Sequence, residues 1–223
     1  MAELYKAKEP FRFFTRLHLT ELTGLRASIL SQFLSLIKEV GGASIYHHTH
    51  RFLQQHQYLS PETPNDFAYW VTEALGEDEL GEKLASIDTM HFSNIRSLRE
   101  KIIMVIEEYM EGNPLSKLKF SRKNEEFYFM KTVSFVFPTP YSAGDLKEFA
   151  ECLHKITIES IYYHVFEARL RLEKKTNDFS RWMEDSLGDK ALAVKIARLD
   201  PYTHTLEDLR KALIAMVKAR LES

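Results

Sequence analysis

The second half of this sequence resembles the first, and this internal similarity constrains the fold more than any other feature. Three short segments return later in the chain: 11–14 as 127–130, 44–48 as 160–164, and 65–70 as 177–182. The separation is 116 residues for the first two pairs and 112 for the third. Because similar patterns specify similar elements, the sequence predicts two similar structural units.

The predicted fold is mainly helical, with two tandem pseudo-symmetric repeats of about five helices, each opened by a short β-strand. We expect the first helical repeat over residues 8–112, a polar linker over 113–126 and the second repeat over 127–222. Ser44 and Ser160 are predicted to cap helices, since a serine hydroxyl accepts a bond from a free backbone N–H. Apolar residues spaced by three and four mark the core face of the first helix in each repeat: Leu30, Phe33, Ile37 and Val40, then Leu146, Phe149, Leu153 and Ile156.

Each predicted strand is marked by apolar residues that alternate with period two. These residues are Phe11, Phe13, Leu17 and Leu19 in the first repeat and Phe127, Phe129, Val133 and Phe135 in the second. An isolated strand is unstable, so we expect either that the two strands pair across a pseudo-twofold axis or that each pairs with a neighbour. Pro138 and Pro140 are expected to end the second strand, because proline donates no bond to a ladder.

Composition excludes several classes of protein. The 223 residues carry a net charge of −2 with a pI near 6.5, which argues against a dedicated nucleic-acid binder. No apolar run approaches the roughly 18 residues that span a bilayer, and the N-terminus lacks the apolar core of a signal peptide. The single cysteine, Cys152, excludes an internal disulfide. We therefore expect a soluble cytoplasmic protein that binds neither membranes nor nucleic acids.

Two signatures together resemble a known family. The segment 44–56 (Ser-Ile-Tyr-His-His-Thr-His-Arg-Phe-Leu-Gln-Gln-His) precedes 65–71 (Asn-Asp-Phe-Ala-Tyr-Trp-Val), and 176–182 (Thr-Asn-Asp-Phe-Ser-Arg-Trp) follows in the second half. This combination is similar to an uncharacterised bacterial family, domain of unknown function 5752. The resemblance covers nearly the whole chain, and it implies no substrate, cofactor or catalytic residue.

Four polar residues of the first repeat form the leading local candidate for a ligand site. At about 100° per residue, a helical wheel places them opposite the apolar face of their helix. They are His47, His50, Arg51 and Gln54. One interpretation is a solvated face or a face between the repeats. The other is a groove that binds a phosphate or carboxylate, because arginine favours planar anionic acceptors.

Two histidines form possible pairs with downstream carboxylates: His48 with Asp66, and His164 with Asp178. One interpretation is structural, with a partly buried histidine bonded to a backbone carbonyl or to the cap of the next helix. Asp66 and Asp178 are themselves predicted helix caps. The other interpretation makes each pair an acid–base or metal half-site. His48 and His50 lie about 160° apart on a helix, so they do not share one ion, and we predict no metal site and no cofactor.

Two functions remain. The first is a non-enzymatic binding or interaction module, built from the duplicated helical unit, that engages another protein or a small anionic ligand. The second is an enzyme or small-ligand-binding protein with a His/Arg anion- or metal-binding groove in the first repeat. The sequence does not decide between them, and it leaves a homodimer open.

Overall fold

The computed structural model describes residues 6–55, 65–172, 176–199 and 205–222. These residues form two compact units. Unit 1 contains the described residues up to Leu17 and those from Ser134 onward, and unit 2 contains the described residues between His18 and Val133. Among the described helices, none has a stretch long and apolar enough to cross a bilayer.

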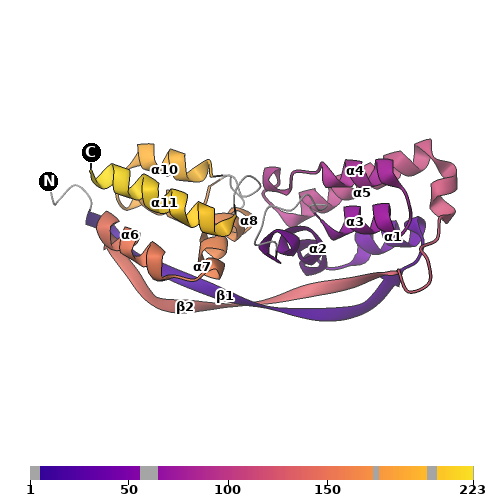
Figure 1. Cartoon of the computed structure of the whole chain (residues 1–223), viewed down its shortest axis with the longest axis horizontal. Coiled ribbons are helices and arrows are strands. Elements are labelled where there is room, and N and C mark those ends of the chain that lie inside the picture. The colour runs from indigo at the N-terminus through magenta and orange to yellow at the C-terminus, as the bar shows by residue number, and fades with distance from the viewer. Residues whose placement is uncertain (1–5, 56–64, 173–175, 200–204, 223) are drawn as a thin grey trace. The chain divides into compact units, whose positions relative to one another are not determined.

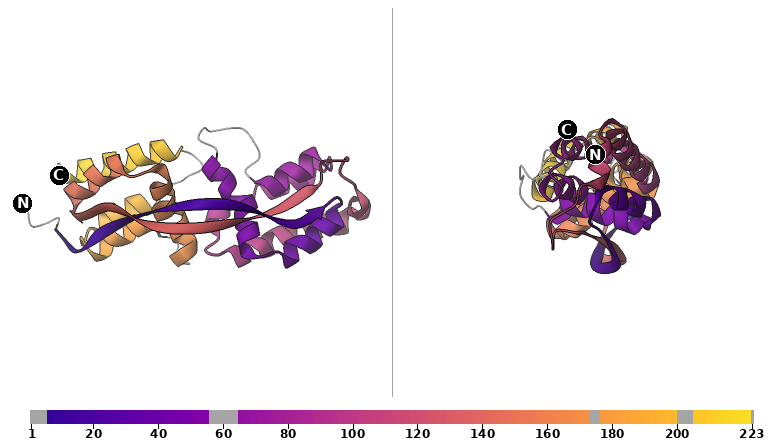
Figure 2. Two further views of the ribbon diagram at one scale, coloured as in Figure 1. Left: turned by 90° about the horizontal axis from the view of Figure 1, so that it is seen from below. Right: turned by 90° about the vertical axis from the view of Figure 1, so that its right-hand side faces the viewer.

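Two long strands, β1 (Lys6–Ala27) and β2 (Phe127–Asp145), run antiparallel and form a two-stranded sheet (Figures 1 and 2). The hydroxyl of Thr23 donates to the carbonyl of Phe129 at 2.6 Å, and that of Thr139 donates to the carbonyl of Phe13 at 2.8 Å. Of the two pairings expected from the sequence, the structure has the one between the strands themselves.

The prediction of a mainly helical repeat fold with short opening strands is wrong. The strands are 22 and 19 residues long, and strand accounts for 22% of the structure beside 60% helix. The prediction that Pro138 and Pro140 end the second strand is also wrong, since β2 continues to Asp145. A strand in a two-stranded sheet has one unpaired edge, where a residue without an N–H is tolerated.

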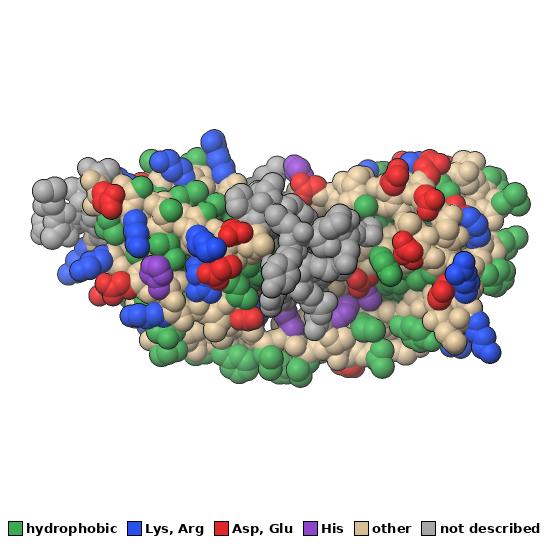
Figure 3. Space-filling view, viewed as in Figure 1, with side chains coloured by type: hydrophobic (Ala, Val, Ile, Leu, Met, Phe, Trp, Pro, Cys, Tyr) green, Lys and Arg blue, Asp and Glu red, His purple; other side chains and the backbone are tan. Residues whose placement is uncertain are grey.

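The burial of side chains shifts by one position along each strand. Phe11 and Phe13 are buried in β1, but the next buried residue is Arg16. In β2 the buried residues are Phe127 and Phe129, followed by Thr132. Three of the four apolar positions predicted after the shift are therefore exposed: Leu17 at 53%, Leu19 at 51% and Phe135 at 45%. The fourth, Val133, is partly buried. Hydrophobic side chains are visible along the strands in Figure 3.

Unit 2 packs its helices around an aromatic cluster. Trp70 lies 4.8 Å from Phe33, and Phe33 lies 5.0 Å from Phe127 of β2 (distances between ring centroids). The indole N–H of Trp70 donates to the carbonyl of Glu125 at 2.6 Å. The helical elements are α1 (Leu30–Glu39), α2 (Gly42–Gln55), α3 (Asp66–Glu73), α4 (Asp78–Ala85), η1 (Thr89–His91), α5 (Ile95–Gly112) and η2 (Pro114–Leu118).

Unit 1 has the corresponding cluster. Trp182 lies 5.2 Å from Phe149, and Phe11 of β1 lies 5.3 Å from Phe179. The indole N–H of Trp182 donates to the carbonyl of Glu9 at 2.8 Å. The helical elements are α6 (Leu146–Lys155), α7 (Ile158–Tyr162), the π-helical turn η3 (Tyr163–Glu167), α8 (Ala168–Leu172), α9 (Asp178–Asp185), α10 (Lys190–Ala197) and α11 (Leu206–Leu221).

In each unit, the buried phenylalanines of the strand come from the half of the sequence that does not supply the helices of that unit. The start of β1 packs on helices that follow β2, and the start of β2 packs on helices that precede it. The compact units and the sequence segments 8–112 and 127–222 are two different divisions of the chain.

The observed helix ends and caps agree only in part with those predicted from the sequence. Gly76 and Gly188, which end matching helices, have φ values of +64° and +72°, the left-handed region that glycine favours. Ser44 and Ser160 do not cap helices as predicted. Their hydroxyls donate instead to the carbonyls of Met130 and Phe14, each at 2.7 Å, and so bond a helix to a strand.

Candidate functional site

In unit 2, His48 joins three elements. It lies on α2, its Nδ1 is 2.8 Å from Oδ2 of Asp66 at the start of α3, and its Nε2 accepts from the backbone N–H of Met130 in β2 at 3.0 Å. The ring is 3% exposed. Because a backbone N–H only donates, Nε2 must present its lone pair, and the neutral ring then carries its proton on Nδ1. His48 therefore donates to the carboxylate of Asp66.

In unit 1, His164 makes the same contacts from the π-helical turn η3. Its Nδ1 is 2.8 Å from Oδ2 of Asp178, and its Nε2 accepts from the backbone N–H of Phe14 at 2.8 Å. The ring is 2% exposed, and its tautomer follows by the same argument. Both pairs predicted from the sequence thus exist, one in each unit.

The two pairs support a structural role. A general base needs a free lone pair, whereas the lone pair of each ring accepts a strand N–H. The structural interpretation named a backbone carbonyl or a helix cap as the partner, and the observed partners are a backbone N–H and the residue next to the cap. The caps are Asn65 and Asn177, whose side chains accept from Ala68 and Ser180, so the prediction that the two aspartates cap these helices is wrong.

His47, His48 and Asp66 each offer one ligand atom within 4.8 Å of the others, which adds His47 to the pair weighed as a metal half-site from the sequence. The hydrogen bonds argue against a metal ion there. An ion bound at Nδ1 of His48 would move the ring proton to Nε2, where it would face the N–H of Met130. That N–H would then lose its acceptor, which costs free energy in a buried site.

The structure describes the side chains of only two of the four residues predicted to form a ligand-binding groove, His47 and His50. His47 and His50 are 8% and 5% exposed, so neither lies on a solvated face. The Nδ1 of His47 is 2.9 Å from the hydroxyl of Thr132 in β2, and His50 stacks on Tyr46 with ring centroids 5.2 Å apart. Arg51 and Gln54 belong to α2, but their side chains lie outside the described residues. Ligand binding by these four residues stays a prediction.

A cavity of about 710 Å³ opens beside His164 in unit 1, built from the start of β1, η3 and α9. Its lining includes the aromatic side chains of Phe14, Tyr163 and Trp182 and the guanidinium groups of Arg12 and Arg181. Sequence reasoning missed both arginines. The signal that reveals them is the comparison of the halves, because Tyr128 stands at the position of Arg12 and Tyr69 at that of Arg181.

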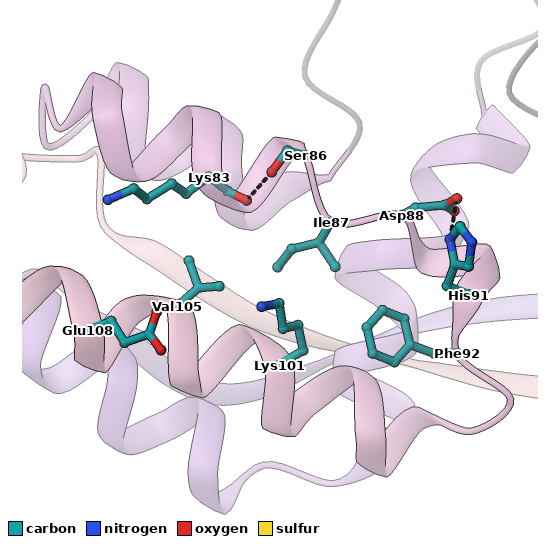
Figure 4. Close-up of a pocket in the computed structure, with 9 residues that line it drawn as sticks. All are labelled: Lys83, Ser86, Ile87, Asp88, His91, Phe92, Lys101, Val105 and Glu108. Carbon is teal, nitrogen blue, oxygen red and sulfur yellow. Dashed lines mark hydrogen bonds and ion pairs between the residues drawn. The ribbon is translucent and has the colours of Figure 1, made fainter.

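A second cavity, of about 500 Å³, lies in unit 2 between the end of α4, η1 and α5 (Figure 4). Ile87, Phe92 and Val105 give it apolar walls, and Lys101 and Glu108 extend to it from α5. No sequence pattern indicates this cavity, because its residues come from three elements with no shared motif.

The lone thiol is not a reactive group. Cys152 is buried on α6, and this burial raises the pKa of its thiol although Lys155 acts in the opposite direction. The protonated thiol therefore prevails at neutral pH, as expected for a small buried side chain.

Comparisons with known proteins agree with the long-strand architecture. A solved structure, "The structure of OrfY from Thermoproteus tenax", matches with a TM-score of 0.80 and 29% sequence identity, over 96% of both chains. A search of curated proteins finds no match. The family model described as "Family of unknown function (DUF5752)" matches residues 8–218. The bacterial origin implied by the resemblance stays an expectation, but the chain belongs to the DUF5752 family.

Proposed function

We propose that this protein is a non-enzymatic binding module whose unit 1 cavity holds a small planar organic anion. The observation that carries the proposal is the combination of Arg12 and Arg181 with an aromatic floor in one cavity. Its volume of about 710 Å³ falls within the ordinary range for small-molecule sites.

Three carboxylates (Glu9, Asp178 and Asp185) and two arginines (Arg12 and Arg181) line the cavity, and the proposal depends on the arginine that has no ion pair. Asp178 accepts from His164, and Asp185 lies 3.5 Å from Nε of Arg181. Arg12 is exposed and has no ion pair among the residues that the structure describes. Its guanidinium is therefore available to bind a carboxylate or phosphate through two parallel N–H bonds. Phe14 and Tyr163, whose ring centroids lie 6.4 Å apart, provide apolar contact for a flat ligand.

Binding is favoured over catalysis because His164 lacks a free ring nitrogen. The one histidine beside the cavity accepts from Phe14 and donates to Asp178, so it is not placed to take a proton from a ligand.

We also infer that the sequence segments 8–112 and 127–222 arose by duplication of one sequence. Support comes from contacts made by matching residues in the two units. The indole of Trp70 donates to a carbonyl just before β2 and that of Trp182 to a carbonyl of β1, and His48 and His164 each accept a strand N–H. The side-chain amides of Asn65 and Asn177 donate to carbonyls near the ends of α4 and α10, respectively. On this view, Arg12 comes from the first copy and Arg181 from the second, and together they mark unit 1 as the unit that became specialised for the ligand.

A thermal-shift screen with aromatic carboxylates and aryl phosphates tests the proposal. A ligand present at about 100 times its dissociation constant should raise the free energy of unfolding by about 2.7 kcal/mol. Arg12→Tyr, which installs the residue found at position 128, should weaken binding by about tenfold or more through loss of a charge-assisted pair. Arg26→Ala, at an exposed arginine of unit 2, is the control and should bind as the wild type does. Equal binding by Arg12→Tyr, or no shift with either ligand class, would contradict the proposal.

A further inference from the structure

The unit 2 cavity contains one cation and one anion that are not paired with each other. Lys101 and Glu108 lie seven residues apart on α5, which is about 10 Å along the helix axis. That spacing exceeds the three or four residues at which helical side chains form ion pairs. Neither residue has an ion-pair partner in the described part of the chain, and both line the cavity, Lys101 half-buried and Glu108 exposed (Figure 4).

The other charged groups of the cavity are already engaged. Nζ of Lys83 lies 2.6 Å from Oε1 of Glu79, and it also lies 5.5 Å above the ring of Tyr109. Nδ1 of His91 lies 2.6 Å from Oδ2 of Asp88. Lys101 and Glu108 are thus the charges open to a ligand.

The wall between these two charges is apolar. Val105 is on the same helix, one turn from Lys101, and is 8% exposed. Ile87 and Phe92 face it from the segment that follows α4 (Figure 4). An uncharged hydrocarbon segment therefore fits between the two ends of the site, because it adds apolar burial without desolvating a charge.

The corresponding helix of unit 1 lacks both charges. Aligning α5 with α11 at a separation of 111 residues, which matches their apolar core positions, places Ala212 opposite Lys101 and Ala219 opposite Glu108. A helix with this core therefore does not need the two charged residues for its fold.

We propose that the unit 2 cavity binds a small zwitterion of the ω-amino acid or dipeptide class. Lys101 holds the carboxylate of this ligand, Glu108 holds its ammonium group, and the hydrocarbon segment lies along Val105. This site is separate from the unit 1 cavity and takes a different class of ligand.

Titration calorimetry on the full chain tests the site with 6-aminohexanoate, hexylamine and hexanoate as probes. The zwitterion should bind about tenfold more tightly than either singly charged probe, because it satisfies both charges. Lys101→Ala should remove its advantage over hexylamine, and Glu108→Ala should remove its advantage over hexanoate. Alanine is the residue at both positions of α11 and is a strong helix former, so the fold should persist.

Two further variants complete the design. Lys101→Gln keeps the length and polarity of the side chain and should lose the preference as Lys101→Ala does. Lys147→Ala, at an exposed lysine of α6, should retain the wild-type preference. Equal affinity for the three probes, no binding of the zwitterion, or a preference that survives in both Lys101 variants would overturn the proposal.

Discussion

The hydrogen bonds of one residue, His48, determine what its surroundings can do. An imidazole that accepts a backbone N–H on one nitrogen and donates to a carboxylate on the other is neutral and oriented, but it has no site left for a substrate proton or a metal ion. His164 is in the same position in unit 1. Each of these residues therefore links a strand to two helical elements, and His164 also lines the unit 1 cavity.

Tyr109 offers a test of a buried polar contact. Its hydroxyl donates to the carboxylate of Glu77, whose other oxygen lies 3.0 Å from Nζ of Lys119. We expect Tyr109→Phe to lower the free energy of unfolding by about 1–3 kcal/mol, because Glu77 is buried and loses a donor. Urea denaturation at pH 7 measures this loss. Tyr69→Phe, at a side chain that is 56% exposed, should change stability by less than about 0.5 kcal/mol.

The same tyrosine gives a dependence on alkaline pH. Burial, followed by the hydrogen bond and charge of Glu77, raises the pKa of Tyr109 to about 12. The folded state thus favours the protonated phenol, so its contribution is complete below the unfolded pKa of about 10 and is lost as the pH rises toward 12. The difference between wild type and Tyr109→Phe should be constant from pH 6 to pH 9 and should shrink above about pH 10.

At the residue scale, the sequence predicted the pairs but not their chemistry. The partnership of His48 with Asp66 was suggested by residues 18 positions apart. The N–H of Met130, which fixes the tautomer, lies 82 positions away and follows only from the strand pairing. Likewise, the wheel placed His50 opposite the core, but it did not show that Tyr46 covers that side of α2.

Among the elements, the link between α10 and α11 depends on Asp189. This carboxylate caps α10 by accepting from the N–H of Leu192 at 3.0 Å, and it lies 2.6 Å from Nε of Arg220 on α11. Burial acts to raise the pKa of Asp189, but the bonds from Leu192 and Arg220 outweigh it and the net pKa is lowered. The stabilisation is therefore present above the unfolded pKa of about 3.9 and is lost as the pH falls through the lower folded pKa.

Asp189→Asn removes the charge of residue 189 but keeps a side chain that can cap α10, because asparagine caps helices as well as aspartate does. We expect a loss of about 1 kcal/mol at pH 7, since Arg220 is partly exposed and its ion pair is screened by solvent. The gap between the two proteins should narrow as the pH falls below the unfolded pKa of about 3.9 and Asp189 becomes protonated. Thermal denaturation from pH 7 to pH 2.5 measures the difference in stability between the two proteins. A difference that persists in acid would contradict the role assigned to the charge of Asp189.

The elements that the sequence predicted well are those with local signals. Leu30, Phe33 and Ile37 marked α1 correctly because a helix is defined by neighbours three and four residues away. The strands were underestimated because their alternation breaks after Phe13 and Phe129. Proline at 138 and 140 was a misleading stop signal, since its effect depends on whether the strand edge is paired.

At the scale of the whole molecule, the exchange of strand segments predicts which fragments fold. A fragment of residues 18–133 contains every described element of unit 2, including both of its strand segments. A fragment of residues 8–112 keeps η1 and the five described α-helices of unit 2 but lacks η2 and the two core residues Phe127 and Phe129. We expect cooperative thermal unfolding, followed by circular dichroism, for 18–133 only. A monomeric 8–112 that unfolds as cooperatively would contradict the exchange.

The division into units also has a consequence for synthesis on the ribosome. The parts of unit 2 are complete once Val133 has been made, so this unit can close while the chain is still growing. Phe11 and Phe13 are made before unit 2, yet their partners Phe149 and Phe179 are made after it. The nascent chain must keep these two aromatic rings without their partners until Phe149 and Phe179 have left the ribosome.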